Sequence, residues 1–223
     1  MWIKICGNTN LDDAQMATAL GADAVGFVFA PSVRQVSAAQ VARIAPHLSR
    51  VEKVGVFPAL DAAEIVAIAE EAGLDAVQLH GGVSLTLLRE LQDSFNGRVK
   101  LIQTVHWQTD DSGDSAEVVA QQLRGISEDG VAERVLVDSK VGAAIGGTGV
   151  TFDWDASRVV LAGAGVKLIV AGGLRPENVG DAIRRLEPWG VDVASGVELK
   201  PGTKDPDKVA DFIRNARKAA QSR

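Results

Sequence analysis

Short runs of β-branched apolar residues alternate along the whole chain with longer segments whose apolar residues recur at helical spacing. This alternation is typical of repeated βα units that build a parallel sheet. Eight strands are predicted, at residues 3–6, 24–29, 53–57, 76–80, 99–105, 134–138, 167–171 and 191–195. Eight helices are predicted between and after them, at residues 11–20, 38–48, 61–72, 84–95, 115–129, 153–162, 176–186 and 206–220.

Helix start and stop signals support these boundaries. Ser37 and Asp61 stand where an N-cap is expected, and Pro176 stands at a first helical position. Gly21 and Gly73 follow the ends of two predicted helices, where a residue tolerant of the left-handed conformation is favoured. The predicted elements therefore have defined limits in the sequence itself.

The predicted strands are nearly continuous runs of Val, Ile, Leu and Phe, as expected for parallel strands covered on both faces. Eight βα units in 223 residues predict one α/β domain over residues 1–223, a single (β/α)₈ TIM barrel. A doubly wound open sheet is the alternative, although it usually has fewer strands and leaves two edges to protect.

Composition narrows the classes of function. A net charge of −6 and a pI near 5.1 argue against a nucleic-acid surface, although a small anion could still bind locally. A single cysteine excludes an intramolecular disulfide and a zinc site of several thiolates, and three histidines leave a metal site possible but unsupported. With no secretory signal and no apolar membrane span, we expect a cytoplasmic protein with no membrane partner.

Polar residues accumulate at the carboxyl ends of the predicted strands, in the loops after them and, for Asp192, within the eighth strand. In a (β/α)₈ barrel these ends and loops form the active site. The residues concerned are Cys6, Arg34, His80, Asp138, Asp192 and Ser195. We therefore expect them to meet at one end of the barrel.

Two glycine-containing loops follow the last two predicted strands. Gly172 and Gly173 lie in one, and Ser195 and Gly196 in the other, where backbone N–H groups could approach an anion closely. This is where barrels often bind phosphate, so we predict a phosphate site, with simple tight turns as the alternative. A further glycine run at residues 146–149 predicts a loop over the ligand or a flexible connection.

Cys6 and Asp138 together suggest acid–base chemistry. If they face each other across the barrel mouth, one can remove a proton as thiolate while the other donates one as carboxylic acid. This is the equipment of an isomerase, although a lone cysteine more often only packs in a core. Arg34 could bind a substrate carboxylate or lie on the surface, and a lone His80 is more often structural.

An ordered set of motifs along the whole chain resembles the phosphoribosylanthranilate isomerase family of tryptophan biosynthesis. The motifs are KICGNTN at residues 4–10, GFVF at 26–29, SVRQVS at 32–37, VGVF at 54–57, VQLHG at 77–81, VDS at 137–139, GTG at 147–149, FDW at 152–154, AGGL at 171–174, SGVE at 195–198 and PGTKD at 201–205.

The resemblance implies a barrel that converts N-(5-phosphoribosyl)anthranilate into 1-(2-carboxyphenylamino)-1-deoxyribulose 5-phosphate by an Amadori rearrangement, without cofactor or metal. By motif, Cys6 is implied as the general base and Asp138 as the general acid. Arg34 is implied to address the anthranilate carboxylate, with His80 and Asp192 nearby. The phosphate is implied to lie on the backbone around Gly172, Gly173, Ser195 and Gly196.

Three other functions compete with this one. A histidine-pathway isomerase performs the same rearrangement on another aminoaldose, but its family has Asp where this chain has Cys6, and two phosphate sites. A dual-substrate isomerase is a variant of that alternative. A non-catalytic phosphosugar-binding barrel would need neither Cys6 nor Asp138. The expected partner is thus a small phosphosugar–anthranilate substrate, bound by a monomer or a homodimer.

Overall fold

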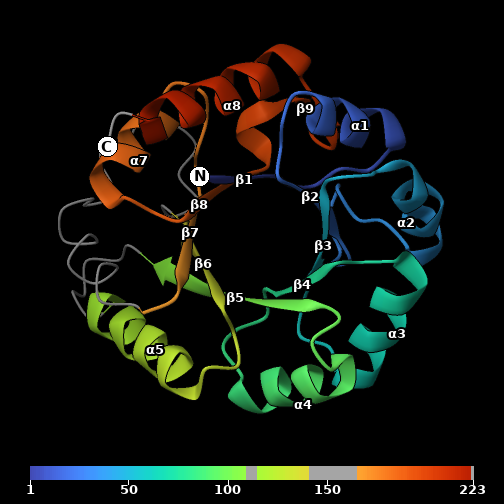
Figure 1. Cartoon of the computed structure of the whole chain (residues 1–223), viewed down its shortest axis with the longest axis vertical. Helices are drawn as coiled ribbons and strands as arrows, with labels where there is room; N and C mark the ends of the chain where they lie inside the picture. The colour runs from blue at the N-terminus through green and yellow to red at the C-terminus, as the bar shows by residue number, and fades with distance from the viewer. Residues whose placement is uncertain (109–114, 141–164, 222–223) are drawn as a thin grey trace.

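Eight parallel strands close into a barrel in chain order, with β1 hydrogen-bonded to both β2 and β8 (Figure 1). The computed structural model describes residues 1–108, 115–140 and 165–221. The predicted helix at 153–162 and the glycine run at 146–149 lie outside these ranges. Closure of the sheet confirms the predicted (β/α)₈ barrel and excludes the open doubly wound sheet.

The strands of the barrel are β1 (Trp2–Ile5), β2 (Ala24–Val28), β3 (Glu52–Phe57), β4 (Ala76–Leu79), β5 (Lys100–Gln108), β6 (Arg134–Lys140), β7 (Lys167–Ala171) and β8 (Gly190–Val193). The helices are α1 (Leu11–Ala19), α2 (Ala38–Ile44), α3 (Ala62–Ala72), α4 (Leu85–Phe95), α5 (Ser115–Asp129), α7 (Val179–Leu186) and α8 (Pro206–Gln221). Two short 3₁₀ helices, η1 (Ala45–His47) and η2 (Ser195–Val197), and a hairpin of β9 (Glu198–Lys200) and β10 (Thr203–Lys204) complete the described chain.

Capping residues explain where several helices begin. The side chains of Ser37 and Asp61 each accept a hydrogen bond from the third helical residue, and the side chain of that residue reaches back to the cap. The start predicted at residue 176 is wrong, because residues 176–178 form a turn and α7 begins at Val179. Asn178 stabilises that turn by accepting from the Arg175 N–H and donating to the Gly173 carbonyl.

Apolar residues pack on both sides of the barrel wall. The larger cluster lies between the strands and the surrounding helices, which Figure 1 shows as an outer ring. A smaller cluster fills the interior and includes Val54, Ile102 and Leu136. Trp2 and Trp189 stack at a centroid distance of 5.4 Å and pack against this inner cluster. The barrel is thus a filled core whose chemistry is confined to its end.

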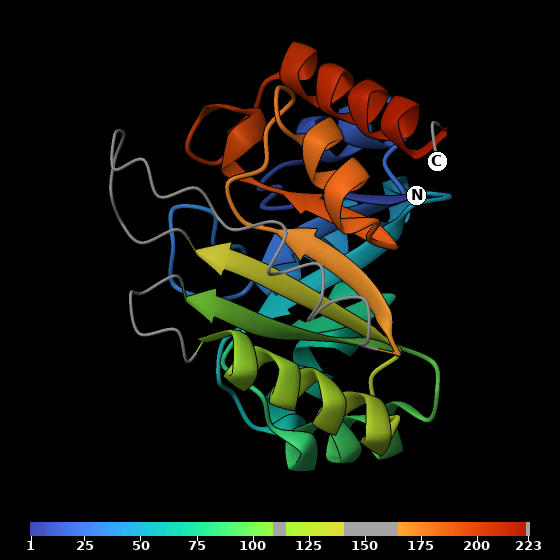
Figure 2. The same ribbon diagram turned by 90° about the vertical axis from the view of Figure 1, so that its left-hand side faces the viewer.

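The β9–β10 hairpin and the described loops that carry the polar residues lie at the carboxyl ends of the strands. In Figure 2 the strand arrowheads point to the left, toward the hairpin, whereas the chain begins at the opposite side. Among the described residues, no helix has the length and apolar character required to cross a bilayer.

Candidate active site

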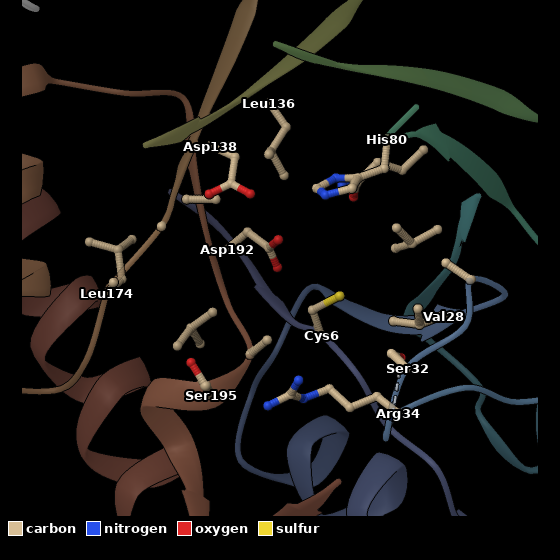
Figure 3. A pocket seen from close by; sticks show the side chains of 18 residues that line it. Cys6, Val28, Ser32, Arg34, His80, Leu136, Asp138, Leu174, Asp192 and Ser195 are labelled. Atoms are coloured by element: carbon tan, nitrogen blue, oxygen red, sulfur yellow. Dashed lines mark hydrogen bonds between the residues drawn. The ribbon is translucent and has the colours of Figure 1, made fainter. Parts of the chain in front are cut away.

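A cavity of about 580 Å³ opens at the carboxyl ends of the strands. Of the nine predicted site residues, eight line it, as Figure 3 shows for those that it labels. The eight are Cys6, Arg34, His80, Asp138, Gly172, Gly173, Asp192 and Ser195. Gly196 lies behind the lining, against the loop after β7. The structure therefore brings the predicted residues together at the end where barrel enzymes carry out their chemistry.

Strand alternation aims Lys4 and Cys6 at the same side of the first strand. Side chains two residues apart share a face of a strand, and Lys4 pairs in register with Asp192 of β8. The Lys4 side chain is fully buried, and its Nζ donates to Asp192 Oδ2 at 3.0 Å and to Gln78 Oε1 at 2.6 Å. Gln78 Nε2 donates in turn to Thr104 Oγ1 at 3.2 Å. A chain of polar groups therefore crosses the interior beneath the cavity.

The thiol of Cys6 lies in a buried, electrically charged environment. Burial raises its pKa above the ordinary value, and Asp192 raises it further, whereas Lys4 and Lys204 act in the opposite direction. For Lys4, burial favours the neutral amine, but the charges and hydrogen bonds of Asp192 and Cys6 together outweigh it, so the pKa of Lys4 is raised. The thiol therefore has a permanent cation beside it.

The two carboxylate oxygens of Asp192 differ in their hydrogen bonding. Oδ2 accepts from Lys4, whereas Oδ1 is buried and has no hydrogen-bond partner in the described part of the chain. A buried acceptor without a partner is costly unless a ligand satisfies it. Asp192 lines the cavity, so a sugar hydroxyl bound there would lie close to this carboxylate.

Arg34 is held by a carboxylate that the sequence analysis did not assign. Its Nε and Nη2 donate to Glu198 Oε1 and Oε2 at 2.7 and 2.6 Å, a bidentate pair that lowers the pKa of Glu198. Nη1 donates to no group among residues 1–108, 115–140 and 165–221. The guanidinium is thus fixed along one edge, and its remaining donors are left for a ligand.

Lys204 fastens this arrangement to the end of the first strand. Its side chain is fully buried, and its Nζ donates to the carbonyl oxygens of Cys6 and Ala194 and to Glu198 Oε1. Burial lowers the pKa of Lys204, and the Glu198 carboxylate only partly offsets this effect. One ammonium therefore ties together the ends of β1 and β8 and the carboxylate that holds Arg34.

His106 on β5 and Asp138 on β6 form a second polar group with His80, which directly follows β4. His106 is the register partner of Asp138, and its ring meets that of His80 edge to face at a centroid distance of 4.6 Å. His106 Nε2 lies 3.0 Å from the His80 carbonyl oxygen, which can only accept, so Nε2 carries a hydrogen. One donor atom from each of the three residues lies within 4.8 Å of the others, so the group could hold a metal ion.

The two glycine-containing loops lie against each other behind the cavity. Gly172 and Gly173 both have positive φ, at 95° and 60°, conformations that glycine adopts without strain. A Cβ built on Gly196 would lie 1.9 Å from the carbonyl oxygen of Leu174, so no larger residue fits between the loops. The predicted anion-binding backbone is therefore formed by two loops in direct contact.

We expect Gly196→Ala to lower kcat/KM by about 10- to 100-fold, because a displacement of roughly 1 Å in a binding loop has effects of that size. The cause is the clash with the Leu174 carbonyl, which forces both loops apart. Gly125→Ala in α5 is the matched control, because a Cβ there meets nothing within 4 Å. Steady-state kinetics on both variants would contradict the expectation if Gly196→Ala kept the unmodified kcat/KM.

Sequence analysis missed five polar residues of the site: Lys4, Gln78, His106, Glu198 and Lys204. Two signals were present. Lys4 stands two positions before Cys6 and so shares its side of the strand. Glu198 and Lys204 lie within motifs that carried the family resemblance, although no role was given to them.

Comparisons with known proteins give consistent results. A model of the N-(5′-phosphoribosyl)anthranilate (PRA) isomerase family matches residues 3–215. The isomerase of Acidithiobacillus ferrooxidans is 38% identical over 96% of this chain and 97% of its own length. Monomers of a dimeric phosphoribosylanthranilate isomerase from Thermotoga maritima superpose with a TM-score of 0.80 at 35% identity, covering 98% of this chain and 99% of theirs. A phosphoribosylanthranilate isomerase bound to reduced 1-(o-carboxyphenylamino)-1-deoxyribulose 5-phosphate superposes with a TM-score of 0.79 at 36% identity, covering 98% of this chain and 99% of its own.

A closed barrel with acidic, basic and thiol groups gathered at its carboxyl end defines an enzyme of the (β/α)₈ class. The family match and the full-length relatives make it an isomerase. The chain belongs to the N-(5′-phosphoribosyl)anthranilate isomerase family, as its motifs predicted.

Proposed function

We propose that the chain catalyses the Amadori rearrangement of N-(5′-phosphoribosyl)anthranilate to 1-(2-carboxyphenylamino)-1-deoxyribulose 5-phosphate in tryptophan biosynthesis. The observation that carries this proposal is the meeting of Cys6, Asp138 and the glycine-containing loops around one cavity, in a chain of this family. The related enzyme bound to a reduced form of that product supports the choice of ligand.

In the proposed mechanism Asp138 acts first, as general acid. Its carboxylic acid protonates the furanose ring oxygen, the C1–O bond breaks, and the nitrogen lone pair forms the C1=N bond of an iminium ion. Cys6, as thiolate, then takes the proton from C2, which gives an enolamine that tautomerises to the ketone. Substrate and product are isomers, so the electrons balance without an oxidant or reductant.

The other predicted residues bind the two ends of the substrate. Arg34, held by Glu198, faces the anthranilate carboxylate with its free donors, and Asp192 Oδ1 accepts from a sugar hydroxyl. The backbone around Gly172, Gly173, Ser195 and Gly196 holds the phosphate, and His80 lines the wall near Asp138. The active form is a monomer or a homodimer, and the dimeric Thermotoga maritima relative supports the latter.

We expect purified protein to consume phosphoribosylanthranilate, which is measured by the decrease of the substrate's fluorescence. The kcat should be the same before and after treatment with a metal chelator. The reason is that acid–base catalysis by Cys6 and Asp138 requires no ion. The Cys6→Ser, Asp138→Asn double variant is the inactive control. Absence of turnover would refute the proposal, and activity lost to the chelator and restored by metal would make His80, His106 and Asp138 a metal site instead.

The histidine-pathway aminoaldose, offered to the same preparation, separates the remaining alternatives. Turnover of that compound alone would favour the related isomerase, and turnover of both would favour a dual-substrate enzyme. Binding of either without turnover would favour a phosphosugar-binding barrel.

A further inference from the structure

Lys4 is a charged residue with no access to solvent or to the cavity. Its side chain is fully buried and does not line the cavity, so it cannot touch a bound substrate. A buried ammonium is costly unless it is paired and hydrogen-bonded. Lys4 meets this condition through Asp192 and Gln78. Its burial at this place therefore calls for an account that substrate contact does not provide.

Gly26 on β2 makes the room in which the Lys4 and Cys6 side chains lie together. A Cβ built there would lie 2.7 Å from Cys6 Sγ and 2.8 Å from Lys4 Cε, so both atoms would clash with the same methyl group. The thiol and the end of the lysine chain are therefore neighbours. Gln78 and Asp192 hold the ammonium from the other strands, which fixes its position relative to the sulfur.

Other charged groups also act on the thiol, but they are engaged elsewhere. Arg34 is paired with Glu198, and Lys204 Nζ is occupied by two carbonyl oxygens and the same carboxylate. Asp192 acts on the thiol with negative charge. His80 and Asp138 line the same cavity on other strands. Among these groups, Lys4 is the cation that shares the strand face of Cys6.

We propose that Lys4 is a positioning residue for Cys6: its fixed ammonium stabilises the negative charge on the sulfur that Cys6 needs in order to accept a proton. The inference rests on the proposed function, in which Cys6 is the base. Burial and Asp192 both oppose the thiolate, and the Lys4 ammonium acts against them. Lys4 acts through Cys6, because it has no route to the substrate.

The first test measures the thiol alone, which is possible because Cys6 is the only cysteine in the sequence. We expect Lys4→Met to raise the Cys6 pKa by about one to three pH units, the effect of losing a nearby opposite charge. The rate of alkylation by iodoacetamide at pH 8 should fall about tenfold or more, because the thiolate is the reactive form. Lys53→Met is the matched control. Lys53 lies near the amino end of β3, away from the cavity at the carboxyl ends, and pairs with Asp75.

The second test follows turnover of phosphoribosylanthranilate by the same variants. We expect Lys4→Met to lower kcat about tenfold or more with little change in KM, and to move one limb of the kcat/KM profile to higher pH by the same amount as the thiol pKa. A thiol pKa equal to that of the unmodified protein would overturn the inference. A raised thiol pKa with unchanged kcat would instead remove Cys6 as base, and the positioning role with it.

A folding control keeps the result interpretable, because Lys4→Met leaves Asp192 without its buried partner. Circular dichroism and thermal unfolding would show whether the variant folds. If it does not, Lys4→Gln replaces it, because a glutamine amide can still donate to the Asp192 carboxylate while the positive charge is lost. The same rise in the thiol pKa is expected for Lys4→Gln, and its absence in the folded variant would be decisive against the inference.

Discussion

Replacement of Cys6 by serine is expected to lower kcat for phosphoribosylanthranilate by about 10²- to 10⁴-fold, the usual contribution of a general base. Serine has a similar shape, but its hydroxyl does not ionise at neutral pH, so the C2 proton loses its thiolate acceptor. The fold should persist, because the cavity wall keeps its shape. Initial rates at saturating substrate give kcat, and circular dichroism checks the fold.

Alkylation of the unmodified protein provides an independent test of the same role. Iodoacetamide should inactivate the enzyme when one carboxamidomethyl group has been incorporated per chain. Saturating product should slow this inactivation, because Cys6 lines the cavity. A Cys6→Ala protein that retains nearly the full rate would show that another group removes the proton.

Replacement of Asp138 by asparagine is expected to lower kcat by a similar factor of about 10²–10⁴ with little change in KM. Asparagine keeps the shape of the side chain but cannot transfer a carboxylic proton to the ring oxygen, so ring opening becomes slow. Asp181→Asn is the matched control, because that carboxylate is exposed on α7 and pairs only with Arg184 in the described part of the chain.

A third variant, Asp138→Glu, tests whether this position needs a carboxyl group. If Asp138→Glu keeps part of the rate while Asp138→Asn does not, the carboxyl group itself is required. Equal rates for Asp138→Asn and the unmodified protein would remove Asp138 from the mechanism.

The barrel could be predicted from sequence because its determinants are local and repeated. Each strand is a short apolar run, and most helices begin at a residue whose side chain caps them, such as Ser37 and Asp61. Among the helices whose first residues and preceding loop the structure describes, the exception is α7, where Asn178 instead forms hydrogen bonds with its own loop. A proline at position 176 gave no information about those hydrogen bonds.

The location of the site was predictable, but its internal network was not. Residues such as Cys6 and Asp138 stand out because a polar group ends an apolar strand. His106 was missed because β5 continues to Gln108, three residues beyond its predicted end. Lys4 was missed because a lysine inside a strand normally indicates a surface position, and only closure of the barrel buries it against Asp192.

Glu198 and Lys204 show a second limit, which concerns distance along the chain. Glu198 meets Arg34 across 164 positions, and Lys204 meets the Cys6 carbonyl across 198. Nothing local to Arg34 or Cys6 indicates these partners. They depend on the β9–β10 hairpin, whose return over the barrel is a tertiary feature.

The fastening of Cys6 by Lys204 also bears on how the enzyme comes into being on the ribosome. The thiol is synthesised before the other strands of the barrel, whereas β8, which pairs with its strand, and Lys204, which binds its carbonyl, follow after them. Domains of this kind reach their native contacts only when the closing elements have emerged. A nascent or truncated chain lacking the residues after β7 therefore has the thiol but not the contacts that surround it in the active site. We expect such a chain to be inactive.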